Sequence, residues 1–494
     1  MANDRKVSSD ELNPRWLANI RHGSSFQNGD LRWNLDYTRV DANDYNYFNE
    51  LNPPVGQIVD NQLLQSTTAG YYQKDWNLTT EIRDYQILLP NTPAPHQLLP
   101  QLSYNQYYTA DKYSFSFNSE ASNFGNRSEQ YKAYTGQRLH AEPAISVPIV
   151  QAPGYSLEAE GKLMATYYQQ DIPDDMSSYF SSTLGMNGLE SNVSRVLPEA
   201  RVHGGMSFDR KTSFNDQPFT QTLEPEVQYL YIPYKNQNNI GLYDTTNMQS
   251  DYYNLFSDRR FAGLDRISDA NRVSYGATTR LFDSENTERL RFTLGQSYDL
   301  VAPQVTLLPL PNDTKQTNSR SLLSLRADAH PTDDWYTHTG VEYNTQTKKV
   351  SSGNGAVEYQ QQKYTTQLNY RFVSKENYVV NTASDDRRDI SQAGAVLKLP
   401  INRDWQLIGA HYRDTQTGQN IDNLLGARYD SCCWAVNFTF ERHNAPDNTT
   451  LTAKPETSYG LQFEFKGLGS VGNGPKYNLN TRLLPYSRPF NLND

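Results

Sequence analysis

The residues with the clearest capacity for chemistry are two adjacent cysteines, Cys432 and Cys433, the only cysteines in the chain. Neighbouring Cα atoms across a trans peptide lie about 3.8 Å apart, whereas an unstrained disulfide needs about 4.4–6.8 Å. A bond between the two would therefore be strained, so they are expected to be free or bonded to thiols elsewhere. In an oxidising compartment those thiols would lie outside this sequence. Two unpaired thiols are the alternative.

The strand expected after the cysteines predicts where their side chains lie. Trp434, Val436 and Phe438 share one face of that strand, because side chains alternate between the two faces. Cys433 then falls in register with the polar face, and Cys432 lies in the turn before it.

Few other residues suggest catalysis. The 8 histidines are scattered, and the chain contains no Cys-x-x-Cys, phosphate-binding loop, His-Glu-x-x-His or Gly-x-Ser-x-Gly motif. The run 353–355 (GNG) is a turn signal. We therefore expect no enzymatic activity, no metal and no cofactor.

A charged cluster falls in the long segment 233–268. It is either a solvated loop with weak surface ion pairs, or an ordered loop that folds into an interior and contacts a partner. The second reading is favoured, because a loop that also carries Phe256, Leu264 and Ile267 has apolar surface to bury. The expected partner-contacting residues are Asp258, Arg259, Arg260, Phe261, Asp265 and Arg266.

The elements that position these residues are predicted by alternation of apolar and polar side chains along the whole chain. In 288–300, Leu290, Phe292 and Leu294 share one face, whereas Arg291 and Thr293 share the other. Many such runs last about 10–13 residues, longer than the usual 5–6 of soluble sheets and enough to cross a bilayer. Roughly 20–22 strands are expected. Strand length favours a transmembrane β-barrel over a secreted β-sandwich.

Composition agrees with a wide barrel that has a wet interior. The mean hydropathy is −0.77, only 36% of residues are hydrophobic, and 35 are Tyr, which suits a membrane boundary. No run approaches the 18 or so apolar residues of a membrane-spanning helix. The net charge of −10 argues against nucleic acid as a partner. The start of the chain lacks the apolar core of a secretory signal, so an upstream segment is expected.

The predicted connections alternate between short and long, as in barrels with tight periplasmic turns and extended outer loops. The long ones are expected at 41–64, 171–193, 233–268, 302–319 and 443–457, with short ones near 73–77 and 331–334. No composition break marks a second domain. We expect one all-β antiparallel barrel over residues 1–467, incomplete at its N-terminal side, and a tail over residues 468–494.

Several motifs, in the same order, resemble the LptD family of lipopolysaccharide-assembly proteins. They are the cysteine pair in 429–434 (YDSCCW) and the runs 220–234 (TQTLEPEVQYLYIPY), 255–267 (LFSDRRFAGLDRI) and 483–486 (LLPY). The likeness extends over nearly the whole chain, with looser matching in the loops. The start of the chain resembles a point several strands into the family barrel, and the family's N-terminal jelly roll and its cysteines are absent.

The resemblance implies a barrel of about 26 strands in the outer membrane of a Gram-negative bacterium, wide enough to need a plug. The implied partners are the lipoprotein plug LptE, lipopolysaccharide, the periplasmic bridge protein LptA through the missing domain, and the barrel-assembly machinery. By the same analogy, Cys432 and Cys433 bond to upstream cysteines. Lipid leaves through a seam between the first and last strands, and the last strand is expected at 458–467. Its gate residues are Tyr459, Leu461, Phe463 and Phe465.

Two rival functions remain open. A general or substrate-specific porin would conduct ions without a plug and gives no reason for tandem cysteines. A secreted β-sandwich that acts as a binding module would be soluble without detergent.

Overall fold

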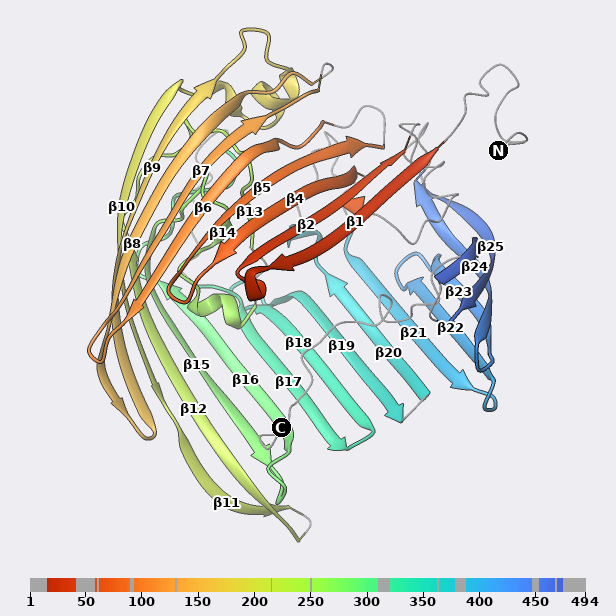
Figure 1. The fold of residues 1–494 in the computed structure, drawn as a ribbon. Helices are drawn as coiled ribbons and strands as arrows, with labels where there is room; N and C mark the ends of the chain where they lie inside the picture. Colours follow the sequence, from red (N-terminus) through yellow and green to blue (C-terminus); the bar gives the residue numbers. More distant parts are fainter. Residues whose placement is uncertain are drawn as a thin grey trace, which may run out of the picture.

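In the described part of the chain the molecule is built around one antiparallel sheet of 24 strands, most of which pair with the next strand along the chain. The computed structural model describes residues 16–40, 58–59, 62–88, 93–128, 131–214, 216–248, 251–309, 320–361, 364–377, 388–446, 453–466 and 469–473. The sheet curves into the wall of a barrel (Figure 1). The predicted all-β antiparallel architecture is therefore confirmed.

The first half of the wall consists of β1 (Leu17–Phe26), β2 (Leu31–Val40), β3 (Ile58–Val59), β4 (Gln62–Tyr72), β5 (Trp76–Ile87), β6 (Gln97–Thr109), β7 (Ser114–Gly125), β8 (Thr135–Ala152), β9 (Tyr155–Asp171), β10 (Asn192–Met206), β11 (Phe208–Phe214) and β12 (Gln217–Ile232). The second half consists of β15 (Ala270–Phe282), β16 (Glu288–Asp299), β17 (Leu323–Thr332), β18 (Trp335–Asn344), β19 (Lys349–Gln361), β20 (Tyr364–Val373), β21 (Ile390–Pro400), β22 (Trp405–Asp414), β23 (Asn420–Asp430), β24 (Trp434–Pro446), β25 (Ala453–Phe465) and β26 (Gly469–Asn473).

The smaller elements lie in turns and loops: η1 (Gln27–Gly29), the π-helical turn η2 (Tyr179–Thr183), η3 (Met186–Gly188), η4 (Tyr253–Phe256), η5 (Lys375–Asn377), and the separate two-stranded sheet of β13 (Thr246–Asn247) and β14 (Phe261–Ala262). No helix in the described part of the chain is long and apolar enough to cross a membrane.

The number of strand positions in the wall agrees with the sequence-based estimate. β10 and β11 both pair with β12 on the same side, so they form one strand with a break at Ser207. β3 pairs with the end of β4 just beyond the part that β2 covers, so β2 and β3 share a position. The 24 strands, less these two shared positions, leave 22 in the wall, within the predicted 20–22.

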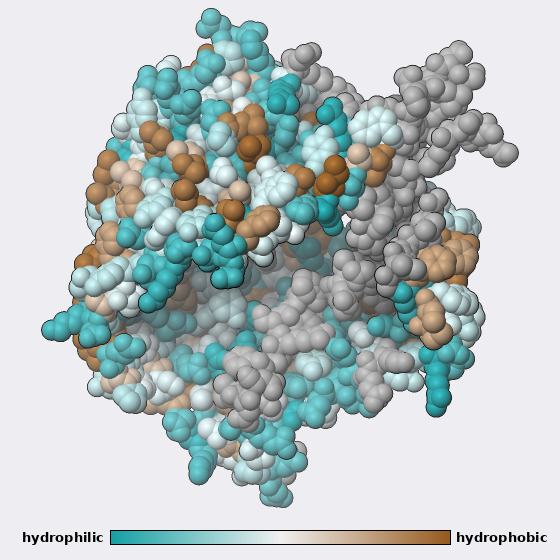
Figure 2. All heavy atoms as spheres, in the orientation of Figure 1, coloured by the Kyte–Doolittle hydropathy of each residue, from teal (hydrophilic) through white to brown (hydrophobic). Residues whose placement is uncertain are grey.

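The alternating faces of the strands place apolar side chains outside and charged ones inside. On β16, Phe292 and Leu294 are exposed, whereas Arg291 and Thr293 are buried toward the interior. The same arrangement, with apolar side chains exposed and polar ones buried, is found around the wall, where the most exposed large apolar side chains include Leu425 at 64%. Figure 2 shows apolar side chains scattered over the outer face of the strands. A β-sandwich would bury these side chains in a dry core, so that reading is wrong.

From β1 to β18 the connections alternate in length as predicted, but the later connections 345–348 and 415–419, at the end where the long ones lie, are as short as turns. Every second connection is a short turn, for example between β8 and β9 or between β17 and β18, and these turns lie at one end of the wall. The long connections at the other end include 172–191 and 233–269.

Three finer predictions are wrong. β26 (Gly469–Asn473) pairs with β25, so 458–467 is not the last strand and the expected tail contains a strand. The glycines of this segment hide the alternation that identifies strands. The run 353–355 lies inside β19 rather than in a turn. β24 and β25 also extend into the expected long connection 443–457 and leave only 447–452 between them.

The two ends of the sheet are open edges in the described part of the chain. There, β1 pairs only with β2, and β26 pairs only with β25. Unpaired strand edges carry free N–H and C=O groups, and lipid cannot satisfy them.

Candidate functional site

The interior of the wall holds a long connection that we call the inner loop, residues 233–248 and 251–269 between β12 and β15. Figure 1 shows its two short strands, β13 and β14, inside the curve of the wall. Its apolar side chains Tyr252, Leu255, Phe261 and Ile267 are all buried. The predicted inward folding of this segment is therefore observed.

A buried arginine of the wall fixes the inner loop. Arg138 on β8 contacts Asp244 at 2.6 Å, Asp265 at 2.8 Å and Glu120 of β7 at 2.7 Å. Arg138 is 1% exposed and Asp265 is fully buried. A buried ion pair resists disruption strongly, because removing one partner leaves an uncompensated charge. One guanidinium group thus holds the inner loop at two positions, Asp244 and Asp265.

Backbone contacts extend this Arg138 cluster. Asp265 accepts hydrogen bonds from the amides of Tyr243 at 2.8 Å and Asp244 at 3.0 Å, which ties the two arms of the loop together. Arg195 on β10 donates to Gln237 at 2.7 Å, and Tyr168 on β9 donates to the Leu264 carbonyl at 3.0 Å.

A second set of ion pairs lies nearer the middle of the loop. Lys162 on β9 pairs with Asp258, and Arg259 pairs with Glu142 on β8. Lys162 also lies 3.4 Å from Glu199 on β10. These loop side chains are less buried than the Arg138 cluster.

The six predicted partner-contacting residues thus divide into two groups. Phe261, Asp265 and Arg266 are buried and present no surface, and Asp265 pairs with Arg138 of the wall. Asp258, Arg259 and Arg260 line an open cavity. That the loop contacts another protein stays a prediction, and only the second group is placed to do so.

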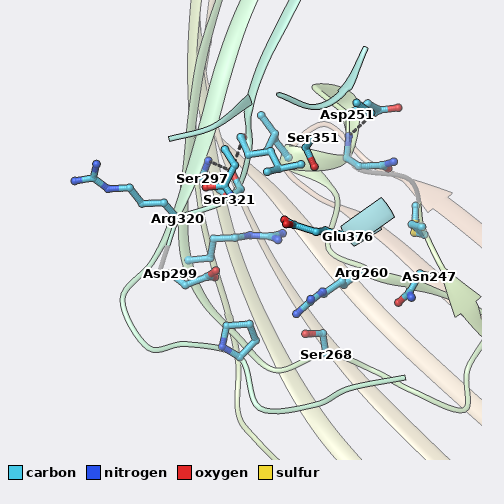
Figure 3. A pocket seen from close by; sticks show the side chains of 18 of the residues that line it. Asn247, Asp251, Arg260, Ser268, Ser297, Asp299, Arg320, Ser321, Ser351 and Glu376 are labelled. Carbon is cyan, nitrogen blue, oxygen red and sulfur yellow. Dashed lines mark hydrogen bonds between the residues drawn. The ribbon is translucent and has the colours of Figure 1, made fainter. Parts of the chain in front are cut away.

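The cavity, about 850 Å³, lies between the inner loop and strands β15, β16, β19 and β20. Figure 3 shows Arg260 from the loop, Asp299 from the end of β16 and Glu376 from η5 directed into the same space. A second cavity of about 620 Å³ lies on the other side of the loop and is lined by Tyr252 and Phe256. In the described residues no group of three or more His, Cys, Asp or Glu side chains is arranged to hold a metal ion.

The two cysteines occupy one of the short turns. The Ser431 amide donates to the Trp434 carbonyl at 2.8 Å, so Cys432 and Cys433 are the two central residues of a tight turn between β23 and β24. The prediction that Cys433 belongs to the following strand is therefore wrong. Both thiols are free and exposed, and their Sγ atoms lie 2.8 Å apart.

The surroundings of the cysteine turn favour one thiolate. The hydrogen bond from Cys433 lowers the pKa of the Cys432 thiol, with smaller contributions from Ser431 and Lys466. The same contact raises the pKa of Cys433. Lys466 donates to the Ser431 carbonyl at 2.6 Å, which holds this ammonium against the turn.

The four predicted gate residues lie on β25, which is paired on both sides. Leu461 is opposite Phe438 of β24 and also opposite Asn473 of β26. Tyr459, Leu461, Phe463 and Phe465 are all exposed on the outer face. They are therefore next to the edge strand rather than on it.

Sequence reasoning did not identify Arg138, Glu120 or Asp244, which carry the strongest contacts of the inner loop. Strand alternation places Arg138 and Glu120 on the inner face. The pairing of Arg138 with Asp244 and Asp265 joins residues 106 and 127 positions apart. Only the folded wall brings them together.

Residues 13–405 match the protein family described as LPS transport system D, LptD. The chain belongs to the LptD family. It is 46% identical to the LPS-assembly protein LptD of Aeromonas salmonicida, over 97% of this chain and 60% of that protein. It is 37% identical to the LPS-assembly protein LptD of Shewanella frigidimarina, over 100% of this chain and 62% of that protein. This LptD-family chain therefore spans about 60% of the length of such relatives.

Among solved structures, the chain resembles the siderophore receptor PirA from Acinetobacter baumannii, with a TM-score of 0.38 and 12% identity over 82% of this chain and 71% of PirA. The family assignment rests on the LptD relatives alone. It confirms the resemblance inferred from the cysteine pair and the inner-loop motifs.

Proposed function

We propose that this chain is the barrel portion of a protein that inserts lipopolysaccharide into the outer leaflet of a Gram-negative outer membrane. The observation that carries the proposal is membership of the LptD family over nearly the whole chain, with relatives named LPS-assembly proteins. The wall has the required physical character. Its apolar outer face suits hydrocarbon, and its charged inner face suits a phosphorylated sugar head.

The proposed exit is a seam between the edge strands of the complete barrel. Parting two strands costs least where few ladder hydrogen bonds join them. β26 is an edge of the described sheet, and Tyr459, Leu461, Phe463 and Phe465 on the adjacent β25 would border lipid that leaves there. No bond is made or broken in this step, so the role is transport rather than catalysis, and its energy comes from elsewhere.

The partners in this proposal are those the family resemblance implies. LptE would occupy the interior as a plug, LptA would deliver lipopolysaccharide to an upstream jelly roll, and the barrel-assembly machinery would insert the wall. Cys432 and Cys433 would bond to cysteines in the upstream part. Their exposure in a short turn, at the end that faces the periplasm in such barrels, supports this pairing.

A light-activated cross-linker at position 471 of β26, in the full-length protein, tests the seam. Illumination should arrest the appearance of new lipopolysaccharide at the cell surface. The matched control carries the cross-linker at position 278 of β15, a strand that is already paired with β12 on one side and β16 on the other. This control protein should export lipopolysaccharide normally. Unimpeded export after efficient cross-linking at 471 would show that the seam is not the exit.

A porin-type channel is the second candidate, because the charged interior would also conduct ions. It predicts that replacing both cysteines leaves the folding of the full-length protein unchanged. Mapping a disulfide from Cys432 or Cys433 to the upstream part would favour the transporter instead.

A further inference from the structure

The tryptophans of this chain are distributed unequally between the two ends of the wall. Five of the six lie close to the short turns, four as the first residue of the strand that follows a turn and one as the third. They are Trp33 on β2, Trp76 on β5, Trp335 on β18, Trp405 on β22 and Trp434 on β24. The sixth, Trp16, precedes β1 at the opposite end, where the long connections lie. We call the five the tryptophan belt.

The tryptophan belt lies on the outer face of the wall. Trp335, Trp405 and Trp434 are exposed on the face that carries the apolar side chains. Trp335 lies 5.0 Å from Tyr359 of the next strand, measured between ring centroids. Trp405 and Trp434 lie 5.1 and 5.2 Å from the ring of Tyr429, which stands between them on β23. Rings of adjacent strands therefore support one another just above the short turns.

The indole N–H groups of the belt remain available as donors. Those of Trp335, Trp405 and Trp434 donate to no protein group in the described part of the chain. Trp33 is different, because its Nε1 donates to the Thr67 hydroxyl at 2.9 Å. An exposed indole at a membrane boundary buries its ring among the upper acyl carbons and directs its N–H to the oxygens of the headgroup layer.

Exposed tyrosines at the long-connection end are bonded to the wall itself. Their hydroxyls contact polar side chains near the beginning of the next strand. These hydrogen bonds join Tyr167 to Asn192 at 2.8 Å, Tyr229 to Asn271 at 3.1 Å and Tyr370 to Ser391 at 2.8 Å. Membrane barrels commonly carry aromatic girdles at both boundaries, whereas here the indoles gather at one. The two ends of the wall therefore differ in what they offer to lipid.

We propose that the tryptophan belt anchors the wall at one boundary only, in the phospholipid headgroup layer that borders the short turns. The wall then keeps a constant height relative to that layer, and a change in bilayer thickness is absorbed at the long-connection end. Trp434 follows Cys433 directly, so the anchor also holds the cysteine turn at that surface. The inference goes beyond the proposed function and needs only that the wall lies in a membrane. It involves neither the seam nor the transported lipid.

Quenching of tryptophan fluorescence by brominated phospholipids tests the anchor. The full chain is inserted into phosphatidylcholine vesicles that carry bromine either near the headgroup or near the bilayer centre. The unmodified chain should be quenched more strongly by the shallow bromine, because five of its six tryptophans lie in the belt. This measurement needs no substitution. Chains that retain only Trp335 or only Trp405, with the other tryptophans replaced by phenylalanine, should show the same preference.

Leu294→Trp in the tryptophan-free chain is the matched control. Leu294 is exposed on the outer face in the middle of β16, so this single tryptophan should be quenched best by the deep bromine. If lipid bromine quenched the control but not the belt, a protein partner or water would cover the belt and the inference would fall. If it quenched neither, the membrane position of the wall would fall as well. Heat-dependent migration on a detergent gel verifies the folding of each variant.

Vesicles with shorter or longer acyl chains test whether the anchor is one-sided. The chain that retains only Trp405 should be quenched best by the shallow bromine in both. Tyr370→Trp in the tryptophan-free chain places the single indole at the long-connection end of β20. Its preference should move from shallow to deep bromine as the bilayer thickens. An equal shift at both positions, or a shift at Trp405 alone, would overturn the inference.

Discussion

Gly276 on β15 and Gly295 on β16 lie directly opposite each other in the wall and together form a socket for the ring of Tyr252. A Cβ at Gly276 would lie 2.6 Å from the Tyr252 hydroxyl, and one at Gly295 would lie 2.7 Å from the ring. The ring cannot withdraw freely, because its hydroxyl donates to Glu226 at 2.5 Å. Two glycines of the wall thus position the middle of the inner loop.

Gly295→Ala should loosen this part of the loop. The added methyl group overpacks the socket at a cost of about 1–3 kcal/mol, and displacing Tyr252 relieves the clash. Hydrogen exchange of residues 251–260 should accelerate by roughly five- to a hundredfold if the cost falls on local opening. Gly161→Ala is the control, since nothing lies within 4 Å of a Cβ there. Equal exchange in both variants would contradict the socket.

Arg138→Met should release the inner loop from the wall. The substitution leaves the buried carboxylate Asp265 without its cation, a loss of about 3–5 kcal/mol for a broken buried pair. Limited proteolysis should then cut within 233–269 at protease concentrations that leave the parent chain intact. Arg138→Met combined with Asp265→Asn should recover part of the protection, because it removes the unpaired charge. If the single variant were cleaved no faster than the parent chain, Arg138 would not be what holds the inner loop to the wall.

Leu461→Arg should impair insertion of the wall into a bilayer. Leu461 is exposed on the outer face of β25, and an arginine on the lipid face of a barrel costs about 2–4 kcal/mol near the bilayer midplane. Gln462→Arg, at the adjacent inward position, should be tolerated. The yield of folded protein in lipid vesicles, read from heat-dependent migration on a detergent gel, compares the two. Similar yields would mean that the faces are assigned the wrong way round.

Cys432 should react with alkylating reagents before Cys433 at neutral pH. Its pKa is lowered and that of Cys433 is raised, and the thiolate is the nucleophile. The preference should fade as the pH rises above both pKa values, because both thiols are then ionised. Mass spectrometry of the first alkylation product locates the modified residue. Equal modification of Cys432 and Cys433 at pH 7 would exclude the difference between their pKa values.

The strands of the wall could be predicted from the sequence better than the contacts of the inner loop. Strand alternation depends on a period of two that survives in single strands such as 288–299, so the faces of the strands, several of the long connections and a total of roughly 20–22 strands could be predicted. β26 was missed because Gly469 and Gly472 carry no side chain to mark a face. In β19, Gly353 and Gly355 suggested a turn from the sequence, although in the structure they pair with Val341 and Thr339 of β18.

The interior could be predicted only in outline. The apolar residues of the inner loop indicated that it folds inward, but not which wall residues receive it. The contact between Arg138 and Asp265 depends on the curvature that brings β8 opposite the end of the loop, a property of the whole sheet. The partner-contacting role of Asp265 and Arg266 stays a prediction: both side chains are buried within the chain, and Asp265 pairs with Arg138.

Accessibility of spin labels along β16 in lipid vesicles tests the central claim, that the wall shows an apolar face to hydrocarbon and a charged face to water. Single labels at 291, 292, 293 and 294, with both cysteines replaced by serine, would be relaxed by oxygen, which concentrates in lipid, or by a water-soluble nickel complex. Labels at 292 and 294 should favour oxygen, and labels at 291 and 293 should favour nickel. A uniform response, or the opposite alternation, would contradict the membrane wall and the transport function built on it.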